Sequence, residues 1–293
     1  TAVFIPAFRE ASVIGATVAH MLAVWPQRDL TIYVGCYRND PGTIAATSAA
    51  AAADRRVRVV IYGADGPTTK ADCLNRLYRA MCADEDRQGS PYASVILHDA
   101  EDMVHPDALA AIDAALAAVD FVQLPVRPVA SHGNRWISGH YADEFAEGHA
   151  KAMVVRNALG LPLPAAGVGC GVSRGALDQL IQTQPGGADT GPFSRDALTE
   201  DYELGLILSR IGRGSAFLRL RAADRRTRLV AHPRSLAMRS LLGAMAQAAV
   251  LASSQVKLPV AYWLAASTCL GANKKIGTQS ASAFTRRMTG KNS

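Results

Sequence analysis

Short apolar, β-branched runs alternate with longer segments of helical periodicity, and this order limits the possible folds more than any other feature. The five apolar runs cover residues 2–6, 30–36, 57–62, 94–97 and 121–125. Helix-like segments lie between them, at residues 10–24, 41–53, 70–82 and 106–119. Strands that alternate with helices form right-handed crossover units. The pattern therefore predicts an α/β fold with a Rossmann-like, mostly parallel sheet flanked by helices.

The second half of the chain is less regular. Helical patterns recur near residues 141–153 and 199–211, and residues 184–195 (QPGGADTGPFSR) read as a long connection. Residues 241–271 are apolar, but polar residues and Pro259 interrupt them before any run reaches the ~18 residues of a spanning helix. We expect an interfacial or partner-packed helix in that segment.

Charge is divided unevenly along the chain. Residues 225–293 contain 11 Lys/Arg and no Asp/Glu, whereas the first 224 residues hold 20 bases and 25 acids. No basic stripe interleaved with aromatic residues runs through the acidic part, so we expect no nucleic-acid partner. A basic tail instead suits an anionic surface, such as the cytoplasmic leaflet of a membrane.

The cysteines and the first residues indicate the compartment. Five cysteines without paired spacing predict reduced thiols in the cytosol; they are Cys36, Cys73, Cys82, Cys170 and Cys269. The chain enters an apolar strand directly after Thr1, with no basic n-region or cleavage site. We expect a fragment of a longer protein and not a secreted precursor.

Unusual residues gather where the predicted strands end. The strands are followed by residues 6–10 (PAFRE), 36–40 (CYRND), 63–70 (GADGPTTK) and 98–106 (HDAEDMVHP). Ligands of open α/β sheets bind beyond the carboxyl ends of the strands. This edge of the sheet is therefore the predicted active site.

The acid cluster after the fourth strand is the strongest chemical signal. Asp99 and Glu101 are two residues apart, so a turn can aim both carboxylates at one hard cation, Mn²⁺ or Mg²⁺. The alternative is a solvated turn in which Asp102 or His105 caps a helix that begins at Pro106. A hard cation prefers oxygen, so capping or packing is the expected role of His98 and His105.

Two further stretches have both a structural and a functional interpretation. Residues 167–171 (GVGCG) form either a tight turn or a backbone wall beside a sugar, and they do not fit a dinucleotide fingerprint. Thr199, Glu200 and Asp201 are typical of a helix N-terminus, and a carboxylate held there can also act as a general base. The sequence contains no GxxxxGK[ST], GxSxG or HExxH motif.

In this order, the motifs resemble family 2 glycosyltransferases, which are inverting enzymes of the GT-A fold. The resemblance rests on FIPAFRE, on Lys70 with Leu74-Asn75, on Asp99-Ala100-Glu101-Asp102 and on Thr199-Glu200-Asp201, and it covers about residues 1–231. It implies a nucleotide-sugar half at about 1–125 and an acceptor half at about 126–231. Residues 232–293 would then be a basic, apolar, helical segment that faces a membrane or a partner.

The resemblance also implies roles for matching residues. Asp99 would face the ribose and diphosphate, Glu101 would bind the metal, and Asp201 would act as the general base beside Glu200. The remaining nucleotide-side positions are Pro6, Phe8, Glu10, Asp40 and Lys70. The acceptor-side positions are Gly169, Cys170, Gly171 and Thr199.

Two departures leave alternatives open. Cys36 stands where many relatives carry an aspartate, so the nucleobase is open, although a UDP-sugar is expected. No Gln-x-x-Arg-Trp element follows Asp201. The expected acceptor is a saccharide or lipid-linked glycan at the cytoplasmic face of a bacterial inner membrane, with flanking transmembrane segments as possible partners. A degenerate nucleotide-sugar-binding component and a nucleotidyltransferase are the alternatives.

Overall fold

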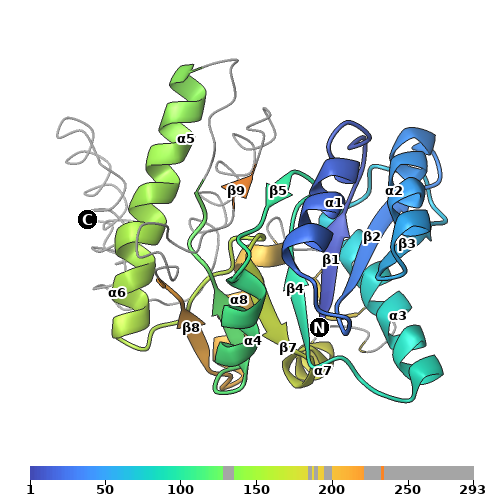
Figure 1. Ribbon diagram of the computed structural model, residues 1–293. Coiled ribbons are helices and arrows are strands. Elements are labelled where there is room, and N and C mark those ends of the chain that lie inside the picture. The colour runs from blue at the N-terminus through green and yellow to red at the C-terminus, as the bar shows by residue number, and fades with distance from the viewer. Residues whose placement is uncertain (128–134, 184–186, 188–190, 195–199, 221–231, 234–293) are drawn as a thin grey trace, which may run out of the picture. The chain divides into compact units, whose positions relative to one another are not determined.

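A seven-stranded sheet in the order β3-β2-β1-β4-β7-β6-β8 lies at the centre of the computed structural model (Figure 1). Its strands are β1 (Ala2–Pro6), β2 (Thr31–Tyr37), β3 (Val57–Tyr62), β4 (Ser94–Leu97), β6 (Phe121–Gln123), β7 (Cys170–Ser173) and β8 (Ser215–Phe217). The structure describes residues 1–127, 135–183, 187, 191–194, 200–220 and 232–233. Of residues 135–138, 141, 200, 232 and 233 it describes the backbone alone.

The sheet is mostly parallel, as the sequence predicts. Strands β1, β2, β3 and β4 pair in parallel, and so do β6 and β8. Strand β7 runs antiparallel to both β4 and β6. It begins within the glycine-rich stretch, where the sequence indicated only a turn or a wall. A second, two-stranded sheet pairs β5 (Asp102–Met103) with β9 (His232–Pro233).

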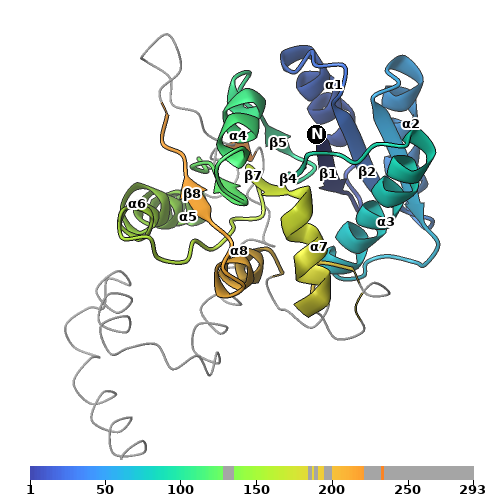
Figure 2. The same ribbon diagram turned by 90° about the horizontal axis from the view of Figure 1, so that it is seen from below.

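Helices cover both faces of the large sheet (Figure 2). One face carries α1 (Ile14–Val24), α2 (Pro41–Ala53) and α4 (Ala108–Leu116), and the other carries α3 (Lys70–Gln88), α7 (Arg174–Thr183) and α8 (Glu200–Arg210). Beside β8 lie α5 (Arg135–Glu147), the π-helical turn η1 (Gly148–Ala152) and α6 (Met153–Ala158).

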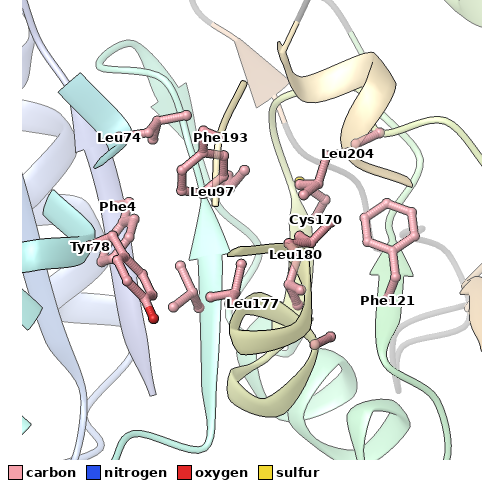
Figure 3. Close-up of a cluster of buried hydrophobic side chains, with 14 of the residues drawn as sticks. Phe4, Leu74, Tyr78, Leu97, Phe121, Cys170, Leu177, Leu180, Phe193 and Leu204 are labelled. Carbon is pink, nitrogen blue, oxygen red and sulfur yellow. The ribbon is translucent and has the colours of Figure 1, made fainter. Parts of the chain in front are cut away.

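Successive side chains of each strand point to opposite faces of the sheet, and each face packs into its own hydrophobic core. In β1, Phe4 packs into the core under α3, α7 and α8, whereas Val3 and Ile5 pack into the core under α1 and α4. Figure 3 shows part of the first core, in which Cys170 and Leu97 from the strands meet helical side chains. All of these side chains are buried, so both faces of the sheet must be apolar.

One predicted helix has the observed boundaries, and two others differ from the prediction. Helix α2 matches residues 41–53, because Pro41 starts it and the Asp40 side chain caps it. Helix α1 starts at Ile14 instead of residue 10. Helix α3 runs past residue 82 to Gln88 and ends at Gly89, which adopts the left-handed conformation (φ 68°).

Several predictions concern residues outside the described part of the chain. These are the interfacial helix at 241–271, the basic tail beyond residue 233, Thr199 and most of the 184–195 connection. Within the described residues, no helix is both long enough and apolar enough to cross a membrane.

Candidate active site

Three neighbouring strands, β4, β7 and β6, bring the loops that form the site to the carboxyl edge of the sheet. Leu97 at the end of β4 pairs with Cys170 at the start of β7, and Cys170 pairs with Gln123 at the end of β6. Because β7 is reversed, the loop that precedes it lies at the same edge as the loops that follow β4 and β6.

Lys70 joins two acids from distant parts of the chain. Its Nζ atom lies 2.7 Å from Asp99 Oδ1 and 3.7 Å from Asp201 Oδ2. Lys70 is the first residue of α3, where the helix dipole disfavours a cation. The two carboxylates offset this unfavourable interaction with the helix dipole. The position of Lys70 is therefore explained by its two partners and not by the stability of α3.

Gly167 forms the wall beside Asp201. Its φ is +74°, and a Cβ atom there would lie 2.0 Å from Asp201 Oδ2 and 3.1 Å from Lys70 Nζ. Only glycine meets both requirements. The sequence indicated a backbone wall at residues 167–171 but named only residues 169–171 as acceptor-side positions, so the contact of Gly167 with Asp201 was not predicted.

Within the acid cluster, Asp102 has a different role from the predicted one. Asp102 is fully buried, and its Oδ2 atom accepts hydrogen bonds from the Asp99 backbone N–H (3.0 Å) and from His98 Nδ1 (2.9 Å). It therefore does not cap the following helix. His105 lies closer to that helix, and its Nδ1 atom accepts from the N–H of Asp107, the residue just before α4, which has no side-chain cap of its own.

Glu101 carries a carboxyl group that is largely buried among other acids. Burial raises its pKa to about 7, and the negative charges of Asp99, Asp102 and Glu10 add to the rise. A cation would relieve this repulsion. Glu10 thus belongs to the same electrostatic environment as the predicted metal-binding pair.

The donor set fits a hard cation held by few protein ligands. Asp99 and Glu101 supply oxygen ligands only, and Mg²⁺ or Mn²⁺ commonly completes its shell with water and phosphate. Among the described residues, no group of three or more acids, histidines or cysteines is arranged to hold a metal by itself.

The predicted nucleotide-side residues Pro6, Phe8 and Asp40 lie at the same edge, but Asp40 acts within the protein. Its carboxylate caps α2 at Thr43 and accepts a hydrogen bond from the backbone N–H of Arg9, which has a φ of 61°. Burial opposes ionisation, but these hydrogen bonds outweigh it and lower the pKa of Asp40. Phe8 packs edge-on against Tyr37, with ring centroids 5.3 Å apart.

The predicted acceptor-side residues do not all lie at the candidate site. The Cys170 side chain is fully buried in the core of Figure 3, and burial raises its thiol pKa to about 12. Gly171 faces α4, where a Cβ atom would lie 2.4 Å from Ile112 Cγ2. These two positions therefore serve packing of the sheet, while Gly169 lies in the loop just before β7 and donates its N–H to the Leu97 carbonyl. Thr199 and the Glu200 side chain lie outside the described atoms.

Asn75 is a second residue whose role the sequence did not show. Its side-chain amide donates to the Phe193 carbonyl (2.7 Å) and accepts from the Phe193 N–H (3.0 Å). This pair fixes the short described segment that precedes α8, and Phe193 fills the core above Leu97. Asn75 belonged to the motif that carried the resemblance, but its sequence position gave no sign of this contact.

Fold and site together define a glycosyltransferase domain of the GT-A type. The chain belongs to the family described as glycosyltransferase like family 2, whose model matches residues 1–241. The predicted resemblance is confirmed, and the domain is that of a transferase.

Two curated relatives are bacterial phage-adsorption proteins. The chain is 35% identical over 223 residues to bacteriophage adsorption protein B of Escherichia coli K12 and to bacteriophage N4 adsorption protein B of Escherichia coli O157:H7. The match covers 76% of this chain and 29% of each relative, so the chain spans less than a third of their length.

Solved structures share the fold at low identity. A Pyrobaculum calidifontis mannosyltransferase in complex with GDP-Man and Mn²⁺ has a TM-score of 0.55 at 18% identity, over 93% of this chain and 80% of its own. Staphylococcus aureus TarS in complex with UDP-GlcNAc has a TM-score of 0.52 at 11% identity, over 82% and 60%. Glucosyl-3-phosphoglycerate synthase of Mycobacterium tuberculosis, in complex with Mn²⁺ and UDP-Glc, gives 0.50 at 18%, over 84% and 74%.

Proposed function

We propose that the domain transfers a sugar from a nucleoside diphosphate sugar to an acceptor hydroxyl, with inversion at the anomeric carbon and with the help of Mn²⁺ or Mg²⁺. The observation that carries this proposal is the Asp99–Lys70–Asp201 bridge. It holds a donor-side acid and a carboxylate of α8 on either side of one ammonium group, each within ion-pair distance of Lys70. Single displacement needs such an arrangement, since the base and the leaving group flank one carbon.

Structures with a similar fold support the choice of donor. The three solved structures hold GDP-Man, UDP-GlcNAc or UDP-Glc, and two of them hold Mn²⁺. A UDP-sugar is the donor we propose, and GDP-sugars are the alternative to test. When bound, a divalent cation held by Asp99 and Glu101 would neutralise the diphosphate and stabilise the leaving group.

The chain's own residues supply the remaining steps. Asp201 accepts the proton of the acceptor hydroxyl, whose oxygen forms the new bond to the anomeric carbon. The bond from that carbon to the diphosphate oxygen breaks, and the nucleoside diphosphate leaves with the electron pair. The Lys70 ammonium lies beside Asp99 and gives the departing diphosphate a second positive charge.

We further propose a saccharide or lipid-linked acceptor and a role in exopolysaccharide or envelope glycan synthesis. The basic composition of residues 232–293 supports work at the cytoplasmic face of a bacterial inner membrane, with that segment facing the membrane or a partner. Residues 1–125 and 126–231 would then be the donor and acceptor halves of the transferase domain.

A second candidate is a nucleotide-sugar-binding component that transfers nothing. The lack of a Gln-x-x-Arg-Trp stretch after Asp201 favours it, because the resemblance places acceptor and diphosphate contacts on that element.

A panel of UDP- and GDP-sugars with Mn²⁺ distinguishes the two candidates. The transferase should release nucleoside diphosphate from one donor, faster when acceptor is present, and Asp201→Asn should remove that release. Tight binding of a nucleotide sugar without turnover would support the binding component. No binding of any donor would contradict both.

A further inference from the structure

Gln123 is a fully buried polar side chain that the proposed reaction does not use. It is the last residue of β6, at the carboxyl edge of the sheet, and none of its surface is exposed. A buried amide needs hydrogen-bond partners, and the choice of partners shows what the residue holds.

All partners of Gln123 are backbone atoms, and most belong to one loop. Its Oε1 atom accepts from the Ala166 N–H (2.8 Å), and its Nε2 atom donates to the Val168 carbonyl (2.9 Å) and the Leu124 carbonyl (2.8 Å). A backbone donor on one side and carbonyls on the other fix the orientation of the amide. Gln123 thus holds the backbone of residues 163–169 by hydrogen bonds, and we call this segment the wall loop.

The wall loop is held from the other side by α8. A Cβ atom at Gly205 would lie 2.0 Å from the Leu163 carbonyl oxygen and 3.1 Å from the Ala165 nitrogen. Helix α8 therefore touches the backbone of the wall loop directly, and no side chain separates them. This helix carries Asp201 in its first turn.

Between these two anchors lies Gly167. Its backbone touches the Asp201 carboxylate, so the position of the wall loop sets where that carboxylate can lie. At its end, Gly169 donates its N–H to the Leu97 carbonyl (3.0 Å), two residues before Asp99. The wall loop therefore connects the donor-side strand to the candidate base.

We propose that Gln123 is a positioning residue for transfer, which holds the wall loop so that Gly167 fixes the place of the Asp201 carboxylate. The inference rests on the proposed function, since it gives Asp201 the role of base. It adds a residue from a different strand, one that touches neither donor nor acceptor. A misplacement of about 1 Å can lower a reaction rate by about 100-fold, so a distant anchor can matter.

The test compares Gln123→Met, which keeps the length of the side chain but removes both hydrogen-bonding ends, with Tyr33→Phe as a control. Tyr33 is also fully buried in a strand and bonded to two side chains, Asp84 and Tyr92, outside the candidate site. We expect Gln123→Met to lower turnover about 10- to 100-fold per folded molecule, with calorimetric binding of UDP and Mn²⁺ unchanged within about twofold. Tyr33→Phe should lose stability but keep turnover.

A second pair approaches the wall loop from α8. Gly205→Ala should displace the helix and lower turnover, whereas Gly175→Ala, a helical glycine with open space around it, should not. If Gln123→Met and Gly205→Ala both turn over as their controls do, the proposal is wrong. If Gln123→Met does not fold, the comparison of Gly205→Ala with Gly175→Ala decides.

Hydrogen exchange separates this proposal from the proposed function. The Ala166 amide should be protected in the wild type, because Gln123 accepts its hydrogen bond, and Gln123→Met should remove that protection while β4 stays protected. Rapid exchange of Ala166 in the wild type would overturn the positioning role even in an active enzyme. Slow exchange of the Ala166 amide in a protein that transfers no sugar would show that Gln123 holds the wall loop, and would refute the proposed function instead.

Discussion

The proposed donor side of the site follows its strands directly, whereas the proposed acceptor side is assembled from segments far apart in the sequence. Asp99 comes two residues after the end of β4, and the loop after β3 leads into Lys70. Asp201 instead lies against Gly167 of the wall loop and beside Lys70 of α3, and both come from distant parts of the chain. Local sequence therefore specifies the donor side, and long-range packing specifies the acceptor side.

The largest expected effect is on the acceptor side. Asp201→Asn removes the proton acceptor, so transfer should fall about 10²- to 10⁴-fold. Calorimetry should show donor binding with Mn²⁺ unchanged within about twofold, since the donor side is intact. A variant that transfers sugar at the wild-type rate would exclude Asp201 as the base.

Gly167→Ala tests whether the wall loop sets the base. The added methyl group overlaps the Asp201 carboxylate, so turnover should fall roughly 10- to 100-fold while donor binding persists. Gly160→Ala is the matched control, because Gly160 has a similar positive φ of 61° but no atom within 4 Å of the added carbon. Equal losses in the two variants would mean that backbone strain, and not the contact with Asp201, causes the effect.

Asp102 offers a test of the donor side that measures stability. Asp102→Ala leaves the Asp99 N–H and His98 without their buried acceptor, and should lower the free energy of unfolding by about 2–3 kcal/mol. Asp102→Asn keeps one oxygen acceptor and should lose less than about 1 kcal/mol. Urea denaturation measures both values, and equal losses would show that the negative charge itself is needed.

Glu101 should make the metal-free protein less stable as pH rises. Its folded-state pKa of about 7 exceeds the ordinary value of 4.5, so its favourable contribution is complete below about pH 4.5 and is lost as pH rises through 7. Glu101→Gln should therefore raise the free energy of unfolding at pH 7.5 by about 1–2 kcal/mol, because the neutral amide removes the buried charge.

The control for this prediction is the bound cation. Mn²⁺ should stabilise the wild type at pH 7.5 and should stabilise Glu101→Gln much less, as followed by thermal unfolding. If stability between pH 4.5 and 7.5 has the same slope in both proteins, Glu101 does not titrate in this range.

Much of the donor side could be predicted from the sequence. Apolar runs gave the first four strands, and the residues after them gave Asp99, Glu101 and Lys70, because parallel strands end at a common edge. The burial of Asp102 and its hydrogen bonds could not be predicted. Whether an acid after a strand faces solvent or is buried beneath its neighbours depends on the packing around it, and here Trp25, which directly follows α1, lies beside His98.

The acceptor side was harder to predict for a physical reason. A glycine-rich stretch shows that side chains are excluded, but not what excludes them. At Gly171 the cause is α4, and at Gly167 it is the candidate base. Gln123 is the one polar residue inside the apolar run 121–125, and only the structure shows that it bonds a loop more than 40 residues later.

The most direct test of the central claim is the anomeric configuration of the first product. The product is formed by the wild-type domain with Mn²⁺ and the donor found in the panel. Early proton NMR spectra report its anomeric configuration, before any free sugar can change configuration by mutarotation. A single displacement with Asp201 as base predicts inversion relative to the donor. Retention would contradict the account, because a single in-line displacement at the anomeric carbon must invert its configuration.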